Sequence, residues 1–177
     1  YNKTAFDAKT VADVLKAMGA SAPAESKDVT LTAPDIAENG AVVPLGAATT
    51  LPNVKQMLVL VEKNPNTLVA AFTVNEALEA NFLTRAKLGQ SSDVYAVAIT
   101  NDGKAFYAKK EVKVISLTGH AIGGMLETAM TSMELPGREM GQRAADMILE
   151  DIEAADDEKP SVQHMVFGTK LIERETT

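Results

Sequence analysis

Two apolar runs on either side of a short turn constrain the fold of this chain more than any other feature. Residues 93–114, DVYAVAITNDGKAFYAKKEVKV, carry β-branched and aromatic side chains before and after the Asn-Asp-Gly sequence at 101–103. Asn, Asp and Gly tolerate the positive φ angles of a tight turn, so this pattern predicts a β-hairpin. A second pair of apolar runs surrounds the Asn-Pro-Asn sequence at 64–66. The sequence therefore predicts antiparallel strand pairing across both turns.

Residues 28–50 extend the β pattern toward the amino terminus. Their sequence, DVTLTAPDIAENGAVVPLGAATT, consists of short Val, Leu and Thr runs that Pro34, Pro44 and the Asn39-Gly40 pair interrupt. Pro and Asn-Gly are typical of turns between strands. Strands at this spacing, with no helical pattern between them, predict an antiparallel sandwich of the immunoglobulin-like kind.

The segment before these strands, residues 4–21, has the pattern of one short amphipathic helix. Its apolar side chains recur at helical spacing. Thr4 and Asp7 have the spacing of a capping box, and Gly19 is a natural helix terminator. We therefore expect a mainly β fold that begins with a helix.

Composition excludes several classes of chemistry. The chain has no Cys, so it has no disulfide, no thiolate metal site and no thiol nucleophile. Its net charge of −7 argues against direct contact with nucleic acid, which needs clustered Lys and Arg. No apolar run approaches the length of a membrane span. Residues 1–114 also lack His and carry scattered carboxylates, so a binding or carrier module is favoured over an enzyme, with no cofactor.

Charge and methionine content both change near residue 114. Residues 1–114 contain 12 basic and 12 acidic residues, whereas residues 115–177 contain 5 and 12 and so account for the whole net charge. Of the 8 methionines, 6 follow the same point. We therefore expect a boundary between a domain at 1–114 and a second piece at 115–177.

The first piece resembles a known family. The runs KDVTLTAPDIAENGAVVPL, NPNTLVAAFTV and SSDVYAVAITNDGKAFYAKKEVKV are similar to SoxY, the sulfur-carrier subunit of the periplasmic thiosulfate-oxidising Sox system. The resemblance covers residues 1–114 and implies an immunoglobulin-like sandwich that pairs with SoxZ in the periplasm. It also implies a Gly-Gly-Cys-Gly-Gly arm after the last strand. The thiolate of such an arm carries the sulfur, and its glycines let it enter narrow active sites.

This chain departs from the family where the arm is expected. After Val114 it reads ISLTGHAIGG, which has glycines but no Cys. Ser and Thr hydroxyls do not form persulfide conjugates, so no other residue can substitute. The carrier chemistry is therefore missing, while the fold and the partner surface are expected to remain.

The last part of the chain predicts a small α/β fragment. We expect strands at 115–119 and 131–135, a short helix within 121–129, a long helix at 136–159 and a strand in 164–177, with a partly parallel sheet. The long helix is the clearest, because apolar residues repeat at helical spacing: Met140, Ala144, Met147, Ile148 and Ile152. Alone, such a fragment buries too little surface for secure stability. We predict that it is loosely ordered, or paired with other copies or with missing sequence.

This fragment resembles the end of the effector-binding domain of LacI-type transcription repressors. The runs TSMELPGREMGQRAADMILEDIE and HMVFGTKLIERETT carry the resemblance, which covers about residues 113–177. It implies a sugar-effector contact at His120, where the family often has an acidic residue, and a cytoplasmic location. The helix-turn-helix of the family is absent from the sequence, so we expect no DNA binding. The alternative function is a sugar-effector-binding regulatory fragment.

Other hypotheses concern the two histidines. His120 with Ser116, Thr118 and Glu127 would form a nucleophilic site, which needs a base held in defined geometry. His120 and His164 would be metal ligands, although no acidic pair has ligand spacing. We favour neither and expect no catalytic residue and no metal.

The origin of the chain is also open. An engineered fusion, a natural mosaic and two separate polypeptides would each explain a boundary at residue 114. A natural mosaic is the least favoured, because the two families work in different compartments.

Overall fold

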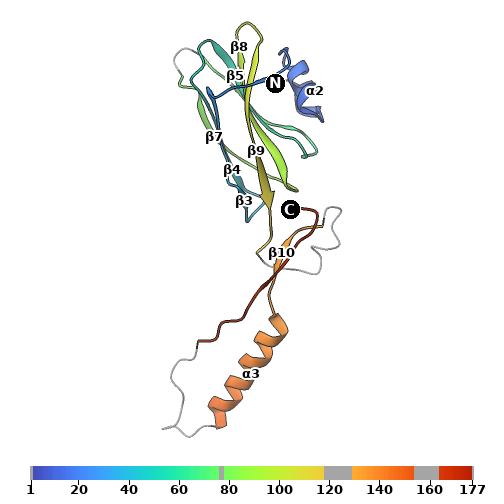
Figure 1. Ribbon diagram of the computed structural model, residues 1–177, viewed down its shortest axis with the longest axis vertical. Helices are drawn as coiled ribbons and strands as arrows, with labels where there is room; N and C mark the ends of the chain where they lie inside the picture. Colours follow the sequence, from blue (N-terminus) through green and yellow to red (C-terminus); the bar gives the residue numbers. More distant parts are fainter. Residues whose placement is uncertain (1, 76–77, 118–128, 154–163, 177) are drawn as a thin grey trace.

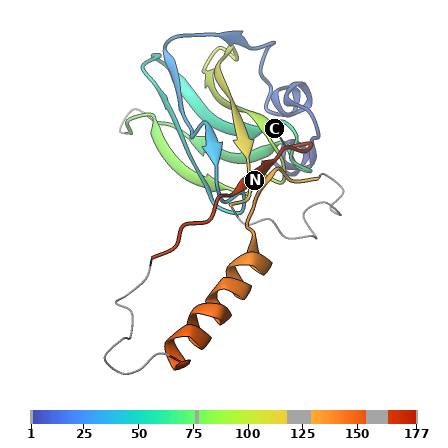
Figure 2. The same cartoon turned by 60° about the horizontal axis from the view of Figure 1, so that its bottom comes forward.

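The structure is a computed structural model that describes residues 2–75, 78–117, 129–153 and 164–176. Most strands gather in one sandwich, and the long helix α3 lies outside it (Figure 1). Figure 2 shows the same separation from a second direction. The prediction of a mainly β chain, with helix at its amino terminus and an immunoglobulin-like sandwich, is confirmed.

The described elements follow one another along the chain in a fixed order. The helices are α1 (Lys3–Asp7), α2 (Val11–Ala17) and α3 (Gly137–Glu153). The strands are β1 (Ala24–Glu25), β2 (Val29–Thr32), β3 (Ile36–Ala37), β4 (Val43–Thr49), β5 (Val54–Val61), β6 (Leu68–Thr73), β7 (Asn81–Ala86), β8 (Ser92–Thr100), β9 (Ala105–Val114), β10 (Ser132–Glu134) and β11 (Lys170–Ile172).

Two sheets form the sandwich. The larger has the order β1-β9-β8-β5-β6, with β3 also paired to β9, and the smaller has the order β2-β4-β7. Strands β5 and β6 pair antiparallel across residues 64–66, and β8 and β9 pair antiparallel across 101–103, as predicted. Gly103 has φ +81°, the left-handed conformation for which the turn sequence selects glycine.

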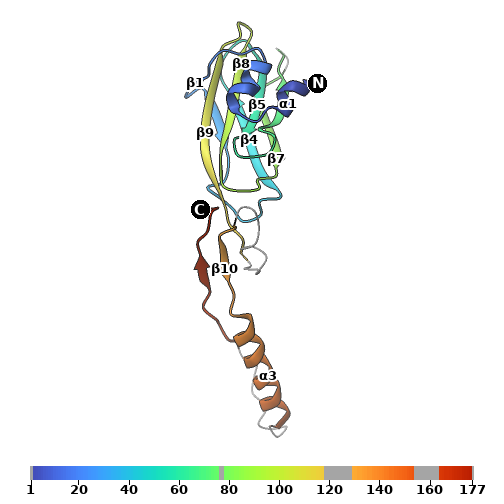
Figure 3. The ribbon, with the colours of Figure 1, turned by 90° about the vertical axis from the view of Figure 1, so that its right-hand side faces the viewer.

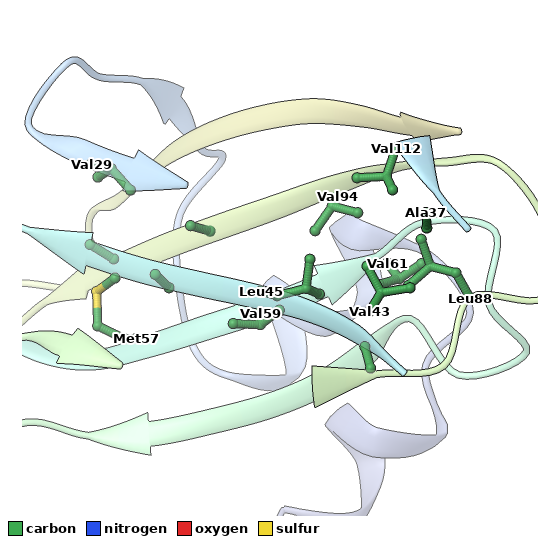
Figure 4. Close-up of a cluster of buried hydrophobic side chains, with 14 of the residues drawn as sticks. Val29, Ala37, Val43, Leu45, Met57, Val59, Val61, Leu88, Val94 and Val112 are labelled. Atoms are coloured by element: carbon green, nitrogen blue, oxygen red, sulfur yellow. The ribbon is translucent and has the colours of Figure 1, made fainter. Parts of the chain in front are cut away.

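The core lies on both faces of the larger sheet. Because successive side chains of a strand point to opposite faces, Met57, Val59 and Val61 of β5 pack toward the smaller sheet (Figure 4). Leu58 and Leu60 point the other way and pack under α1 and α2. Coverage of both faces explains why β5 is apolar at nearly every position.

The amino-terminal helix is two short helices, so the prediction of a single one is wrong. Asn2, not Thr4, caps α1: its Oδ1 accepts the Ala5 N–H at 3.1 Å. Thr10 caps α2, and its Oγ1 accepts the Asp13 N–H at 3.1 Å. Thr10 is therefore an ordinary N-cap, since its hydroxyl satisfies an N–H group that has no partner within the helix. The same hydroxyl donates to Asp13 Oδ2 at 2.7 Å.

The end of α2 follows the prediction. Gly19 has φ +70°, and its N–H donates to the Lys16 carbonyl at 3.1 Å. The Ala20 N–H donates to the Leu15 carbonyl at 2.9 Å. These two bonds form a Schellman motif, which needs a left-handed residue directly after the helix.

The carboxy-terminal segment is partly parallel, as predicted, but its parallel pairing is a single bridge. Strands β10 and β11 pair antiparallel, with Ser132 opposite Ile172. Of the strand expected at 115–119, Ser116 makes one parallel bridge to Ser132, and the short helix expected within 121–129 lies almost wholly outside the described residues. A parallel crossover needs its helix packed on the sheet. No residue of α3, described from Gly137 to Glu153, is buried, so that packing is not made.

We expect the backbone amides of α3 to exchange quickly in a dilute sample. An isolated helix of this length is marginal in water, and Gly141 within it lowers helix stability further. Hydrogen–deuterium exchange read by mass spectrometry should show little protection in α3 and strong protection in β5 and β8. Slow exchange throughout residues 137–153 of a dilute monomer would contradict this prediction.

Candidate functional site

The end of β9 is the place where a carrier arm is expected to leave the sandwich. Val114 is buried there and pairs with Ala37 of β3, and the Ile115 N–H donates to the Ala37 carbonyl at 3.2 Å. A Cβ atom at Gly40 would lie 2.6 Å from the Leu88 carbonyl oxygen and 3.1 Å from Val114 Cγ1. Only glycine allows the loop after β3 to pass this close to the strand end.

A buried Ser hydroxyl joins the end of β9 to the end of the chain. Ser91 Oγ accepts the Val114 N–H at 2.8 Å and donates to the Thr176 carbonyl. The Thr131 N–H donates in turn to Thr176 Oγ1 at 2.9 Å. Ser91, Thr131 and Thr176 are all buried. We call these three residues the hydroxyl junction. Figure 3 shows the carboxy-terminal end of the chain beside the end of β9.

The backbone after Ile115 is held by further hydrogen bonds. The Ser116 N–H donates to the Thr131 carbonyl, and the Met133 N–H donates to the Ser116 carbonyl, both at 2.9 Å. Arg174 supports the same strand, because its Nη1 donates to Ser132 Oγ at 2.8 Å. Through Ser116 the chain therefore continues in strand-like pairing, not as a free arm.

The polar groups of this region anchor the end of the chain to the end of β9. The hydroxyl junction supplies buried donors and acceptors that satisfy one another, which is how proteins hold polar groups away from water. The sequence has no Cys, so no thiolate is present to carry sulfur. Within the described ranges, no group of three or more His, Asp or Glu side chains is placed to hold a metal ion.

The residues singled out as possible reactive groups are not tested by this geometry. His120, Thr118 and Glu127 lie outside the described residues. His164 is described and exposed. The effector contact at His120 therefore stays a prediction, as does the expected absence of a catalytic residue and of a metal site.

The hydroxyl junction was not predicted from the sequence. Ser91 and Thr176 are 85 positions apart, and Thr131 and Thr176 are 45 apart. Isolated Ser and Thr residues are usually exposed, and no spacing rule relates groups this distant. In the sequence, the pair Thr176-Thr177 stands out only as the end of the run that resembles the LacI-type family.

Charged and aromatic groups gather on the face of the larger sheet that carries α1 and α2. Lys109 Nζ lies 2.8 Å from Asp93 Oδ2, and this hydrogen-bonded ion pair raises the pKa of Lys109. Burial raises the pKa of Tyr95, and the Glu62 carboxylate, which accepts its hydroxyl at 3.1 Å, raises it further. Lys109 Nζ also lies 5.9 Å from the centroid of the Tyr95 ring. Because these groups pair with one another, we assign them a structural role.

The turn between β8 and β9 carries a separate shift. Hydrogen bonds from Lys104 and Thr100 hold the pKa of Asp102 well below its usual range. Lys104 Nζ lies 2.8 Å from the Asp102 carboxylate. Both side chains are exposed, so this ion pair contributes little to the stability of the hairpin.

The outer face of the smaller sheet has an open apolar groove. Its volume is about 500 Å³, and Leu45, Gly46 and Leu83 contribute to its lining. Leu83 of β7 stands opposite Gly46 of β4 and is 81% exposed. A side chain at position 46 would meet Leu83, since a Cβ atom there would lie 3.0 Å from Leu83 Cδ2.

Comparison with solved structures identifies a similar fold. The sulfur carrier protein SoxY from Chlorobium limicola f thiosulfatophilum is 30% identical, with a TM-score of 0.54, and the alignment covers 59% of this chain and 96% of that one. A superoxide reductase from Ignicoccus hospitalis is 18% identical, with a TM-score of 0.44 and coverage of 49% and 78%. A putative superoxide reductase from Thermotoga maritima is 15% identical, with a TM-score of 0.43 and coverage of 49% and 84%. The two reductases are too distant to support a conclusion.

Comparison with family models gives two matches. Residues 91–177 match the periplasmic binding protein-like domain. Residues 14–119 match the sulfur oxidation protein SoxY. Among curated proteins, no significant match is found. The SoxY match spans more than half of the chain and agrees with the structural similarity to a SoxY protein, so this chain belongs to the SoxY family.

Proposed function

We propose that this chain is a SoxY-type scaffold that docks a SoxZ-like subunit in the periplasm but carries no sulfur itself. The observation that carries the proposal is the end of β9. The backbone is hydrogen bonded through Ser116, and the chain has no thiol. The sandwich that precedes this point matches the family. In this proposal the chain is a docking protein and has no catalytic residue.

The domain boundary belongs to the same proposal. We infer that residues 1–114 form the SoxY-type domain and that residues 115–177 form a separate α/β fragment. The two family matches overlap over 91–119, which contains β8 and β9. Pairing supports assigning these strands to the sandwich, because β8 lies between β5 and β9 in the larger sheet.

Binding to SoxZ tests the docking function. The full chain and a SoxZ protein, mixed at micromolar concentration, are expected to elute together from a size-exclusion column. The Ile148→Glu variant changes only the exposed helix α3 and is expected to bind SoxZ equally well. Absence of any complex with the unaltered chain would count decisively against the proposal.

Intact mass tests the missing carrier chemistry. After incubation with thiosulfate and the sulfur-loading Sox enzymes, the unaltered chain is expected to keep the mass of its sequence, near 18.8 kDa. The Ile122→Cys variant, which places a thiol directly before Gly123 and Gly124, provides the reference for a reactive protein. A covalent sulfur adduct on the unaltered chain would overturn the proposal.

The match of residues 91–177 to a periplasmic binding protein-like domain favours a second candidate function. In that function the carboxy-terminal fragment binds a sugar effector, with His120 at the contact. A ligand that binds the folded state raises the melting temperature. A rise in melting temperature with sugars or sugar phosphates would support this function, and no shift across a panel of them would rule against it.

A further inference from the structure

The tail of the chain, residues 170–176, is bound to the rest of the protein by strand pairing and by side-chain hydrogen bonds. Its strand β11 pairs antiparallel with β10, and Figure 3 shows the two strands beyond the end of β9. The other edge of β10 pairs with Ser116. Removal of the tail would therefore expose one edge of β10, and an exposed strand edge is a template for another strand.

Arg174 of the tail contacts three successive residues before and within β10. Its Nη1 donates to the Met130 carbonyl at 2.7 Å and to Ser132 Oγ at 2.8 Å. Its backbone N–H donates to Thr131 Oγ1 at 2.8 Å, and its carbonyl accepts the same hydroxyl at 3.3 Å. Thr131 is fully buried and Ser132 is 3% exposed. A guanidinium holds its N–H groups in a fixed plane, so Arg fits this pair of acceptors better than Lys does.

Thr176 is the second anchor of the tail. Its Oγ1 accepts the Thr131 N–H at 2.9 Å, and its carbonyl accepts the Ser91 hydroxyl. Thr131 thus bonds to Arg174 through its side chain and to Thr176 through its backbone. The arrangement recognises an Arg and, two residues later, a hydroxyl side chain.

The segment that leads to the tail adds little to its attachment. Of the residues described between 135 and 169, none is buried, and Val166 is 96% exposed. In this part of the chain the tail is therefore held by its own contacts. It can leave them without unfolding the sandwich, whose core lies elsewhere.

We propose that Ser91, Met130, Thr131 and Ser132, which we call the tail site, bind an extended segment of another protein, and that the tail blocks this site in cis. The partner segment has the pattern of residues 170–176: three extended residues that pair with β10, an Arg two residues after them, and a Ser or Thr two residues after the Arg. Backbone pairing supplies affinity, while the Arg and the hydroxyl supply specificity. The tail is thus an autoinhibitory segment.

Competition with the tail weakens the binding of any outside ligand. A ligand tethered to its own site has an effective concentration of up to about millimolar, so a free peptide at micromolar concentration displaces the tail from few chains. Arg174→Ala removes two hydrogen bonds of the tail and leaves every residue of the tail site unchanged. Hydrogen bonds of a charged group each contribute roughly a tenfold factor or more, so the variant should bind a free peptide at least about tenfold more tightly.

Fluorescence anisotropy with the full chain and a labelled peptide of residues 169–177 measures this gain. We expect weak binding to the unaltered chain and at least about tenfold tighter binding to Arg174→Ala. Arg138→Ala makes the same change on the exposed helix α3 and should leave the affinity for the peptide unchanged. An affinity that Arg174→Ala leaves unchanged or lowers would overturn the proposal.

A substituted peptide tests recognition of the Arg side chain. The peptide that carries Arg174→Ala should bind the Arg174→Ala chain about tenfold less tightly than the natural peptide does, because the Met130 carbonyl and Ser132 Oγ then have no guanidinium to accept from. Equal affinity of the two peptides would refute the proposed specificity.

An engineered disulfide tests whether the peptide and the tail share one site, because the chain has no Cys of its own. Met133 of β10 lies opposite Leu171 of β11, and paired residues of antiparallel strands are close enough for a disulfide. With Met133→Cys and Leu171→Cys added, the Arg174→Ala chain should bind the peptide when reduced and not when oxidised. Both measurements use one protein, so the comparison does not depend on the stability of the variant. Equal binding in the two states, or none in the reduced state, would contradict a shared site.

Discussion

The Leu58→Ala variant is expected to lose about 3 kcal/mol of unfolding free energy, within the roughly 2–5 kcal/mol range for buried Leu→Ala changes. Leu58 is fully buried on the face of β5 that packs against Val14 and Leu15 of α2. Removing its side chain leaves a cavity that strands β6 and β8, paired to either side, cannot close. Urea denaturation followed by circular dichroism measures the loss.

Leu83→Ala is the matched control for this variant. It removes the same side chain from an exposed position of β7, so the change in unfolding free energy should stay within about 0.5 kcal/mol. Equal losses in the two variants would contradict the packing of the larger sheet against α1 and α2.

The Ser91→Ala variant is expected to lower the unfolding free energy by about 2 kcal/mol, because a buried group without its hydrogen-bond partner costs roughly 1–3 kcal/mol. The Val114 N–H would lose its acceptor, and the Thr176 carbonyl would lose its donor. The variant should also loosen one particular part of the backbone. Amide exchange at Val114 and Thr131 should become faster, because the end of the chain would no longer be anchored at the hydroxyl junction.

Coupling within the hydroxyl junction provides the control. Thr176→Val removes the Oγ1 acceptor of the Thr131 N–H and should also destabilise the protein. Since both changes release the same tail, the double variant should lose less than the two single losses added together. Fully additive losses, or unchanged exchange at Thr131 in Ser91→Ala, would show that Ser91 does not anchor this segment.

Rules based on neighbouring residues predicted the turns. They failed where contacts between residues distant in the sequence determine the structure. The turns at 64–66 and 101–103 and the helix end at Gly19 follow from residues that tolerate particular φ angles, and the structure has them as predicted. The break between α1 and α2 was not predicted. There the Ala8 carbonyl accepts the Thr67 N–H at 3.3 Å, from the turn after β5. In a continuous helix the Ala8 carbonyl would instead accept an N–H group from the next helical turn. Thr67 is too far along the sequence for any local pattern around Ala8 to include it.

The carboxy-terminal segment illustrates the same limit. Periodicity predicted a helix within 136–159, and the structure has α3 from Gly137 to Glu153. The order of the elements predicted a partly parallel sheet, and the structure has one parallel bridge, from Ser116 to Ser132, beside the antiparallel pair of β10 and β11. The direction of pairing depends on whether the connecting helix packs back on the sheet, and an apolar stripe does not specify the surface that covers it.

The sequence by itself determined the chemistry that this protein lacks and the turns that shape its sandwich. A thiol is either encoded or absent, and a turn depends on a few neighbouring residues. Only the tertiary structure decided that Ser91, Thr131 and Thr176 meet at the end of β9. Hydroxyl groups have no sequence spacing that brings them together, so their pairing depends on the path of the whole chain and on the burial that follows from it.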